Sequence, residues 1–565
     1  MGTVIQDAQR SKDDHPRRWN RSQRAQLFDQ YLDLHAQGLS LRQAAKALEV
    51  PRSTLQAWRA YQASLDEHPA VVAFFHSSPG LAFLHRLVVA IHLVCTEVGA
   101  CGIRLVCLLL KLTALDRFVA ASYGIQHQVN RQVEEAIVTY RREESSRLAK
   151  AMPAKDITLA KDETFSGGLC LVAVDPKSNY IVLEQAAPGR DQDTWQTLME
   201  KALSGLNCQV IQSTSDEAPG LLAYVEHHLG AHHSPDLFHV QHELVKAVSG
   251  PMATKQRAAA KAVSETQARL EQAQEHLAPT SDEPNAQASK SSPKAPLSLE
   301  QAQHEAQVAR QELERISVQR EQVAQSIRGI GQAYHWVDVE RGVRRNGQLI
   351  AADIQRHLDT IRGVAQHAAL SQSCFDRIDK AERVVPKMQA TIDFVSGYVR
   401  NQVRKLALVP SVAYALHAHL MPACYLERVA QSRTMRAGAP LRELAERLRA
   451  PLFEPGGRLA ALNLTEQRQL MQQAQELAEV FQRSSSNVEG RNGYLSLRNH
   501  QLRGLDRPRK RECLTTVHNF FLTRPDGTTA AERFFGQKPR SMFAAILDSV
   551  DLPPAPLSPP RRALG

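Results

Sequence analysis

Residues 157–240 alternate short apolar runs with residues that favour turns. Gly167 and Gly168 follow the first run and Pro176 to Asn179 follow the second, so we expect the chain to reverse at both places. Longer segments with helical spacing separate the later runs. The expected strands are Ile157–Phe165, Gly168–Val174, Tyr180–Glu184, Cys208–Ser213 and Pro235–Val240, and the expected helices are Asp193–Leu206 and Pro219–Leu229. This order, βββαβαβ, predicts an α+β fold with a mixed β-sheet.

Three acidic residues occur where this order brings chain segments together. Asp162 lies on the first expected strand, and Asp216 directly follows the fourth expected strand. The first and fourth strands are neighbours in a βββαβ sheet. Glu489 opens a late expected helix. Phosphoryl transfer assisted by two metal ions needs carboxylate oxygens from separate elements, with the ions roughly 3.5 to 4 Å apart. Asp162, Asp216 and Glu489 are therefore the candidate metal ligands and catalytic residues.

Other acidic residues compete with this assignment. Glu163 and Glu217 adjoin the two aspartates, and we expect them to face the opposite side because side chains alternate along a strand. Asp175 also follows an expected strand and remains an alternative for the first position. A single aspartate at a strand end is more often a turn former than a metal ligand, so the assignment depends on the three carboxylates together.

Two further patterns accompany these carboxylates. Asp236-Leu237-Phe238-His239 follows the second aspartate closely, and residues 519–535 end in Ala-Ala-Glu-Arg-Phe-Phe. With these patterns the chain resembles, over residues 157–535, the DDE transposases of insertion sequences. The resemblance is to those whose core is split by a large helical insertion, as in the hAT and Mutator-like groups. The long stretch between Asp216 and Glu489 would be that insertion.

The resemblance implies a ribonuclease H-like core that binds two Mg²⁺ (or Mn²⁺) ions. Asp162 and Asp216 would hold the ions, and Glu489 would bind the second one. The ions would activate water for strand cleavage and then a 3′ hydroxyl for strand transfer. His239 would lie beside the scissile phosphate as a hydrogen-bond donor or proton shuttle. The implied partners are transposon terminal inverted repeats and target DNA, both double-stranded, bound by a homodimer or larger assembly.

The N-terminal region has the pattern of a helix-turn-helix. Helical spacing runs from about residue 22 to 61 with a break at Gly38, and small Ala44 and Ala45 permit close helix crossing. Leu55 and Trp58 are spaced to face the core. The alternative is a small helical bundle with a solvated polar face. Side chains left outward, available to phosphates and base edges in a major groove, are those of Arg52, Ser53, Thr54, Gln56 and Arg59.

The segment after His239 is predicted to be helical as far as about Phe481. Apolar residues recur every seven positions on both sides of a polar tract at residues 279–296, which predicts an antiparallel coiled-coil hairpin over 254–331 with a disordered tip. The same repeats could instead form a seam between two chains. They are Val263, Leu270 and Leu277 before the tract, and Ile316, Val323 and Ile330 after it.

These patterns divide the chain into successive regions. A helical domain with a second candidate helix-turn-helix follows the first, the catalytic core is split in two, and a disordered, proline-rich tail ends the chain. Basic residues near Glu489 are expected to contact the DNA backbone, with a solvated surface as the alternative. The regions are 1–65, 66–150, 151–245, 246–480, 481–548 and 549–565, and the basic residues are Arg491, Arg498, Arg509, Lys510 and Arg511.

Composition agrees with a polyanionic partner. Lys and Arg total 69 against 59 Asp and Glu, a net charge of +10. Charged residues interrupt the most apolar stretch, 80–112, so no uncharged run reaches the roughly 18 to 20 residues that a bilayer requires. Residues 1–24 lack the apolar segment of an export signal. We therefore expect no membrane partner and a cytoplasmic protein of a bacterium, associated with the nucleoid when bound to DNA.

Cysteine usage excludes some alternatives. The eight cysteines show no CxxC pair, which predicts free thiols instead of a disulfide framework. His417, His419 and Cys424 lie close together, but a fourth zinc ligand at finger spacing is missing. Two other functions remain open: a non-catalytic DNA-binding regulator, such as a domesticated transposase copy, and a ribonuclease H-like nuclease without end recognition.

Overall fold

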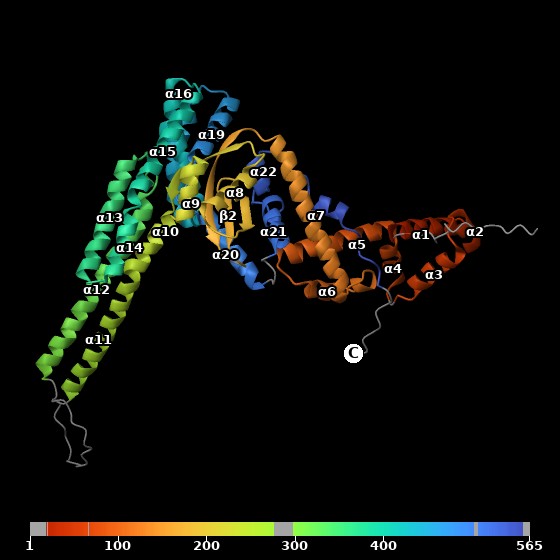
Figure 1. The fold of residues 1–565 in the computed structure, drawn as a ribbon, viewed down its shortest axis with the longest axis horizontal. Helices are drawn as coiled ribbons and strands as arrows, with labels where there is room; N and C mark the ends of the chain where they lie inside the picture. The colour runs from red at the N-terminus through yellow and green to blue at the C-terminus, as the bar shows by residue number, and fades with distance from the viewer. Residues whose placement is uncertain are drawn as a thin grey trace, which may run out of the picture.

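The protein is mostly helical, with one mixed five-stranded sheet at its centre (Figure 1). The computed structural model describes residue 19 and residues 21–65, 67–165, 167–275, 298–501 and 507–556. Three bodies follow one another along its length: the N-terminal helices, the sheet with its covering helices, and a helical insertion that ends in a long arm. The expected tip at 279–296 lies outside the described residues.

The sheet has the strand order β3-β2-β1-β4-β5. β1 pairs antiparallel with β2 and parallel with β4, while β2–β3 is antiparallel and β4–β5 is parallel. The expected α+β class and mixed sheet are therefore correct. The strands are β1 (Lys155–Thr164), β2 (Cys170–Asp175), β3 (Tyr180–Ala186), β4 (Cys208–Ser215) and β5 (His232–Pro235).

The fifth strand lies earlier in the chain than the sequence pattern predicts. We expected a strand at Pro235–Val240, but β5 ends at Pro235 and helix α10 (Leu237–Leu244) follows at once. Asp236 caps this helix, because its side chain accepts a hydrogen bond from the Phe238 N–H. The apolar residues after Pro235 therefore belong to a helix face.

Helices cover both faces of the sheet. α8 (Gln192–Leu203) and α9 (Pro219–Tyr224) pack on the face that carries Leu159, whereas α20 (Ser486–Gln501) packs on the face that carries Ala160. α21 (Pro508–Phe520) lies beside β3, where the Asn519 amide bonds both the N–H and the C=O of Ile181. This contact satisfies backbone groups of an edge strand.

The first three helices form a small unit with its own core. α1 (Arg21–Ala36), α2 (Leu41–Ala47) and α3 (Arg52–Ala63) enclose buried Ala44, Ala45 and Leu55. Gly38 takes a φ of 90° in the turn after α1, a conformation that favours glycine. Of the five predicted DNA contacts, Arg52, Ser53, Gln56 and Arg59 are exposed and Thr54 is half-buried. This packing is compatible with both the helix-turn-helix and the alternative of a small helical bundle with a solvated polar face.

Residues 67–150 do not form a separate domain. Their helices share one apolar cluster with β1, α8 and the C-terminal helices α21, α22 and α23. In place of a second short recognition helix, α7 runs unbroken for 28 residues and packs against α21 and α23. The helices are α4 (Pro69–His76), α5 (Ser78–Ile91), η1 (His92–Val98), α6 (Ile103–Leu112), α7 (Tyr123–Lys150), α22 (Ala530–Phe535) and α23 (Met542–Ser549).

Among the described residues, one helical stretch, Ser78–Val98, is long and apolar enough to cross a membrane by length and composition. In this structure 44% of its most apolar window is buried inside the protein. Three polar side chains on it are buried and paired with other elements: His92 bonds Gln126 at 2.8 Å, Thr96 donates to Asn130 at 2.7 Å, and Glu97 accepts from Lys510 at 2.5 Å. One face of the stretch therefore packs within the protein.

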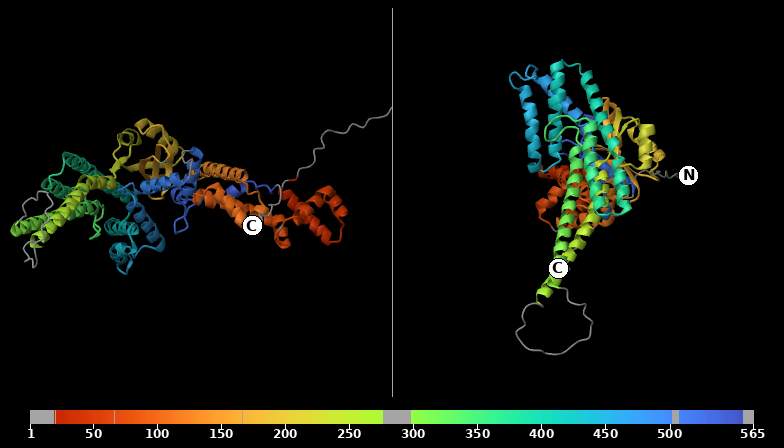
Figure 2. Two further views of the ribbon diagram at one scale, coloured as in Figure 1. Left: turned by 90° about the horizontal axis from the view of Figure 1, so that it is seen from below. Right: turned by 90° about the vertical axis from the view of Figure 1, so that its left-hand side faces the viewer.

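The coiled coil is a hairpin within one chain. α11 (Gly250–Glu275) and α12 (Leu299–Ala333) run antiparallel and project from the body as an arm (Figures 1 and 2). Arg269 pairs with Glu305 at 3.3 Å, and Gln256 donates to Ser317 at 2.9 Å, which sets the register of the two helices. The heptads left open a hairpin within one chain or a seam between two chains, and this structure has the hairpin.

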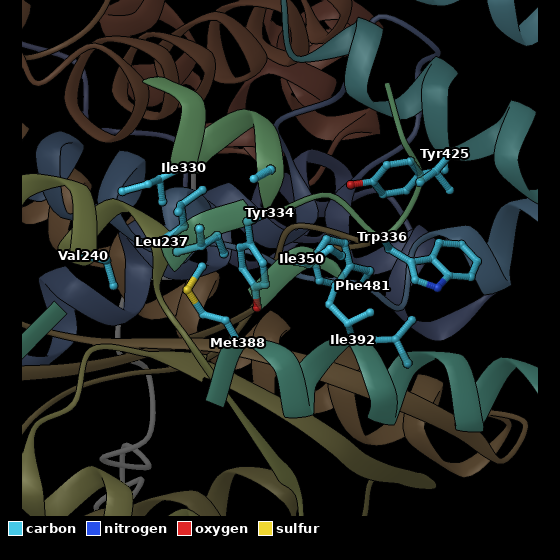
Figure 3. Close-up of a cluster of buried hydrophobic side chains, with 14 of the residues drawn as sticks. Leu237, Val240, Ile330, Tyr334, Trp336, Ile350, Met388, Ile392, Tyr425 and Phe481 are labelled. Atoms are coloured by element: carbon cyan, nitrogen blue, oxygen red, sulfur yellow. The ribbon is translucent and has the colours of Figure 1, made fainter. Parts of the chain in front are cut away.

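The rest of the insertion packs around the base of this arm. Figure 3 shows Tyr334, Trp336 and Phe481 pointing into one apolar cluster, and Leu237 and Val240 of α10 join the same cluster. Helix α10, which carries His239, is thus packed on the insertion. The remaining helices are α13 (Gly347–His367), α14 (Gln372–Glu382), α15 (Val385–Lys405), α16 (Pro410–Ala415), η5 (Leu416–Leu420), α17 (Met421–Gln431), α18 (Met435–Phe453) and α19 (Leu464–Ala478).

The tail from 549 is not loose over its described part. His85 bonds the Val550 carbonyl at 2.6 Å, and Arg21 donates to the Pro553 carbonyl at 2.8 Å. The Ala120 N–H donates to the Pro554 carbonyl at 2.9 Å. The expected disorder is wrong for residues 549–556, because helices far away in the sequence supply donors for these carbonyls; residues 557–565 lie outside the described residues.

Candidate metal-binding active site

Asp162 and Asp216 lie at the same level on neighbouring parallel strands. Ala160 pairs with Thr214, and each aspartate follows its paired residue by two positions. Asp162 is half-buried; its carboxylate accepts from its neighbour's backbone N–H at 2.8 Å and from the Asn492 amide at 2.8 Å. Asp216 accepts from the Ala218 N–H at 3.3 Å. The strand order thus brings the two predicted ligands together.

Asp236 and His239 stand at the start of α10, next to the end of β4. The Asp236 N–H donates to the Ser215 carbonyl at 3.1 Å, so β5 delivers it beside Asp216. His239 follows by one helical turn, and its Nε2 lies 3.8 Å from the Asp236 carboxylate. The Asp236-to-His239 pattern is therefore part of the same cluster as the predicted ligands.

Glu489 reaches the cluster from the first turn of α20. Its Oε1 lies 4.0 Å from His239 Nε2. Ligand atoms of Asp236, His239 and Glu489 all lie within 4.8 Å of one another. Asn492 is one turn further along the same helix face and donates to Asp162, so one helix contacts both the aspartate and the histidine.

α20 is fixed on the sheet by buried contacts. Val488 packs among the apolar side chains of β1 and β2, and Arg491 forms an ion pair with Glu184 of β3 at 2.5 Å. The segment just before the helix is bound as well, since Ser485 donates through its N–H and its hydroxyl to the Asp236 carboxylate. The position of Glu489 therefore follows from the packing of its helix.

The electrostatics of the cluster favour a cation. Burial raises the pKa of Asp162 to about 6, with the nearby charges of Asp216 and Asp236 acting in the same direction. Burial also raises the pKa of Glu489, again with help from Asp236 and Asp162. Among the described residues, His239 is the group whose positive charge opposes both shifts. Several carboxylates therefore share one site with little compensating charge.

This donor set fits a hard divalent ion. Mg²⁺ and Mn²⁺ prefer carboxylate and other oxygen ligands, and imidazole is an acceptable ligand for Mn²⁺ more than for Mg²⁺. Asp236, His239 and Glu489 form the group of ligand atoms within 4.8 Å of one another, and the predicted ligands Asp162 and Asp216 lie outside this group on the adjacent strands. Asp236 adds a fourth carboxylate, although both of its oxygens already accept hydrogen bonds. The residues present fit the predicted group.

A cleft of about 750 Å³ opens beside the carboxylates. Asp216, Asp236 and His239 line it together with Arg190, at the end of the loop before α8, and Lys380 of α14. The insertion therefore forms one wall of the cleft and the sheet forms the other. Of the predicted site residues, Asp216 and His239 line this cleft, whereas Asp162 and Glu489 do not.

The competing acids have other partners. Glu163 pairs with Arg190 at 3.2 Å, and both residues line the cleft together with Asp216, so the expectation that Glu163 faces away from the site is wrong. Glu217 pairs with Lys387 of α15 at 2.5 Å. Asp175 is buried and accepts hydrogen bonds from Ser178 in the turn between β2 and β3. Asp175 therefore stabilises that turn, and it is rejected as the alternative for the first ligand position.

The predicted backbone contacts near Glu489 require correction. Arg491 and Arg498 are 6% and 3% exposed, since Arg491 is paired with Glu184 and Arg498 donates to the carbonyls of Glu97 and Val98. Internal partners take up their charged groups, which leaves them unavailable to phosphates in this structure. Lys510 pairs with Glu97 and Glu134, and Arg511 is 3% exposed. Arg509 differs from the other four, because its side chain is about half exposed where it pairs with Glu135.

Two residues of the cluster carry roles that the sequence patterns did not assign. Asp236 was part of a motif, but its hydrogen bonds to Ser485 become visible only in the folded chain. Asn492 bonds Asp162 directly. Its spacing of one helical turn from Glu489 is the signal that points to it, because residues three apart share a helix face.

Comparisons with known proteins assign no activity. A family described as "Family of unknown function (DUF6399)" matches residues 416–562, a span that includes Glu489 but neither Asp162 nor Asp216. No curated protein and no solved structure matches the chain.

Proposed function

We propose that the protein is a DDE-type DNA transposase, a metal-dependent nuclease and strand transferase with a ribonuclease H-like core. The observation that carries this proposal is that Asp162 and Asp216 lie at the same level on adjacent strands, while Glu489 is grouped with Asp236 and His239 beside them, and Asp216, Asp236 and His239 line a cleft. The sheet order β3-β2-β1-β4-β5 supports the fold, because a ribonuclease H-like core has its first and fourth strands parallel and adjacent.

The carboxylates would have distinct tasks. Asp162 and Asp216, on adjacent strand ends, would hold the ions, and Glu489 would bind the second one. Two divalent ions at this site would supply the activation of a water or a 3′ hydroxyl and the neutralisation of charge on the phosphate. Asn492 would hold the Asp162 carboxylate in one orientation.

His239 stands between these acids and the cleft. Its ring nitrogen Nε2 lies near two carboxylates and has no hydrogen-bond partner among the described residues. His239 lines the cleft, and its imidazole could donate a hydrogen bond or transfer a proton to the leaving oxygen of a substrate phosphate. The N-terminal three-helix unit, with its exposed Arg52, Gln56 and Arg59, would recognise the DNA ends.

The experiment is cleavage of an end-labelled duplex that carries the DNA flanking the gene, with Mg²⁺ or Mn²⁺. Asp216→Asn and Glu489→Gln are each expected to reduce strand cleavage by at least about a thousandfold, since each removes a charged ligand. Glu243→Gln is the matched control: Glu243 lies on α10 and lines the same cleft but pairs with Arg377. This control is expected to retain activity within about tenfold.

Either of two outcomes would reject the proposal. Cleavage that survives both ligand variants would show that the activity uses other residues. Specific binding of the duplex without metal-dependent cleavage by any form would favour a DNA-binding regulator, which the exposed face of α3 alone could serve.

A further inference from the structure

Residues 479–485, the linking segment between α19 and α20, contact the start of α10. The Arg483 C=O accepts a hydrogen bond from the Leu237 N–H at 3.0 Å. Two residues later, Ser485 donates its N–H and its hydroxyl to the carboxylate of Asp236, the N-cap of α10. The part of α10 that belongs to the candidate site is therefore held by this segment.

The side chain of Arg483 contacts the base of the arm. Its guanidinium donates to the Tyr334 C=O at 3.4 Å and to the His335 ring nitrogen Nε2. Tyr334 is the C-cap of α12, the second helix of the arm, and it packs in the same apolar cluster as Leu237 (Figure 3). Arg483 thus binds the arm through its side chain and α10 through its backbone.

His335 is suited to accept this hydrogen bond. A guanidinium has donors only, so Nε2 must be the unprotonated ring nitrogen. The proton of the neutral ring then lies on Nδ1, which donates to the Tyr425 hydroxyl of α17 at 2.7 Å. Burial, together with the charge of Arg483, holds the pKa of His335 well below its usual range. The ring is therefore neutral near pH 7 and is fixed between Arg483 and α17.

Arg483 has no acidic partner among the described residues. Arg345, which also contacts the end of α12, does have one, because it pairs with Asp353. Burial lowers the pKa of Arg483, which shows that its charge is partly removed from water. Neutral acceptors compensate a buried charge less well than an opposite charge does. The contact is therefore an inefficient way to stabilise the fold, and this favours a role in positioning.

We propose that Arg483 is a positioning residue for the candidate metal site, through which the site and the base of the arm change together. Arg483 holds the linking segment against α12, and this segment sets the positions of Asp236 and Glu489. With His239, these two acids form the group whose ligand atoms lie within 4.8 Å of one another. The inference rests on the metal binding in the proposed function, and it does not require DNA cleavage.

Such a coupling acts in both directions. If the contact with α12 favours the metal-binding arrangement of the cluster, a bound ion favours the contact with α12 by the same free energy. Metal binding should therefore reduce local opening at the end of α12, over residues 330–335. A side chain that only stabilised the fold would give no reason for a response to metal at this place.

The first test measures metal affinity without DNA. Mn²⁺ alone is titrated into the full-length protein, and the free ion is followed by electron paramagnetic resonance. Arg483→Met is expected to weaken Mn²⁺ binding about 10- to 100-fold, the usual effect of removing a group that orients a metal ligand. Arg483→Lys keeps a charged donor and is expected to bind Mn²⁺ more tightly than Arg483→Met.

Arg345→Met is the matched control. Arg345 donates to the Ala333 C=O at 3.0 Å, so it contacts the same end of α12, but it does not contact the linking segment. Its replacement should lower stability and leave the Mn²⁺ affinity equal to that of the parent.

His335 provides a second pair of variants, which tests the same link if Arg483→Met does not fold. His335→Phe removes the acceptor for Arg483 and is expected to weaken Mn²⁺ binding. His335→Gln keeps an acceptor in its amide oxygen and is expected to bind Mn²⁺ more tightly than His335→Phe.

The second test measures hydrogen exchange with and without saturating Mn²⁺. In the parent and the Arg345→Met protein, Mn²⁺ is expected to slow amide exchange over residues 330–335. In Arg483→Met and His335→Phe, exchange over these residues is expected to be the same with and without the ion.

Each outcome decides the question. Weaker Mn²⁺ binding in Arg483→Met or His335→Phe, with loss of the metal-dependent protection, supports the proposal. Unchanged affinity in these variants overturns it, and so does weaker binding with the protection retained. An equal loss in Arg345→Met, or a parent that binds no Mn²⁺, also overturns it. A parent that binds Mn²⁺ and does not cut DNA would reject the proposed function and leave this test intact.

Discussion

The Arg491 guanidinium and the Glu184 carboxylate form a buried, two-point ion pair between α20 and β3, with N–O distances of 2.5 and 2.8 Å. Thr515 of α21 donates to the same carboxylate at 2.8 Å. Removal of one partner leaves the other charge buried and unpaired, so Arg491→Met is expected to lower the free energy of unfolding by about 3–5 kcal/mol. Denaturant titration measures this loss.

An exposed ion pair provides the comparison for that prediction. Arg509 pairs with Glu135 at 3.0 Å, and both side chains are nearly half exposed. Arg509→Met is expected to cost less than about 1 kcal/mol, because solvent screens such a pair. Equal losses in the two variants would contradict the assignment of Arg491 to a structural role.

Ser485 is expected to matter for metal binding more than for stability. Its hydroxyl and N–H both donate to Asp236, which links the segment before α20 to the start of α10. Loss of a hydrogen bond that orients a carboxylate reduces metal affinity about 10- to 100-fold, so Ser485→Ala should shift the Mg²⁺ concentration for half-maximal cleavage by that factor. The loss of stability should be about 1–2 kcal/mol.

Ser484→Ala is the control for this prediction. The Ser484 hydroxyl donates to Ser486 at the surface and does not contact Asp236. Its Mg²⁺ dependence should equal that of the parent. A Ser485→Ala protein with an unchanged metal requirement would show that the link to Asp236 is dispensable.

The metal-free protein is expected to lose stability as pH rises through about 6. The pKa of Asp162 is raised from 3.8 to about 6. A carboxyl with a folded pKa above its unfolded value contributes stability below about pH 4, and that contribution is lost as pH rises through the folded pKa. The loss is about 2 kcal/mol after allowance for partial exposure. Melting curves in EDTA between pH 4 and 7 measure it.

Asp162→Asn is expected to flatten that pH dependence, because the amide does not titrate. Asp193→Asn, at an exposed position in the first turn of α8, should leave it as in the parent. Mg²⁺ should also flatten it, because the ion competes with the proton for the carboxylate. The same steep pH dependence in the Asp162→Asn protein would show that other groups cause it.

The exposed face of α3 is expected to carry the sequence preference for DNA. Gln56 and Arg59 of α3 are exposed, whereas Leu55 of the same helix is fully buried in the three-helix core. Substitution of Gln56 or Arg59 should therefore leave the core intact. Gln56→Ala should weaken binding to the preferred duplex by about 1–3 kcal/mol and leave binding to unrelated duplexes unchanged. Competition binding measures the ratio.

Gln26→Ala, on the exposed side of α1, is the control for α3. It should not change either affinity. If Gln56→Ala lowers binding to all duplexes equally, Gln56 contacts the backbone and the preference for sequence lies elsewhere.

The first four strands could be predicted because each is an apolar run bounded by turn residues. The fifth could not: β5 reads His-His-Ser-Pro, and its strand conformation comes from pairing with β4 and from α15 on its outer side. His232 stacks on Phe394 of that helix and bonds Thr391 at 3.0 Å. Such tertiary contacts override local propensity.

The carboxylates of the candidate site could be predicted because strand order alone makes Asp162 and Asp216 neighbours. The basic residues could not, because a pattern of arginines on a helix is the same for a surface and for buried ion pairs. The partners of Arg491 and Arg498 lie 307 and 401 positions away in the sequence. Likewise, the heptads indicate a coiled coil, but only contacts such as Arg269–Glu305 decide that one chain forms it.

The separation of Glu489 from the sheet has a consequence for the order of synthesis. A ribosome completes all five strands and both aspartates long before it reaches α20, and the Ser485 contact with Asp236 requires the whole insertion to be in place. A nascent or truncated chain would therefore hold a folded sheet and an incomplete ligand set. On the proposed function, an unfinished copy would be harmless to the genome that encodes it, and cutting would begin only after the last third of the polypeptide has folded.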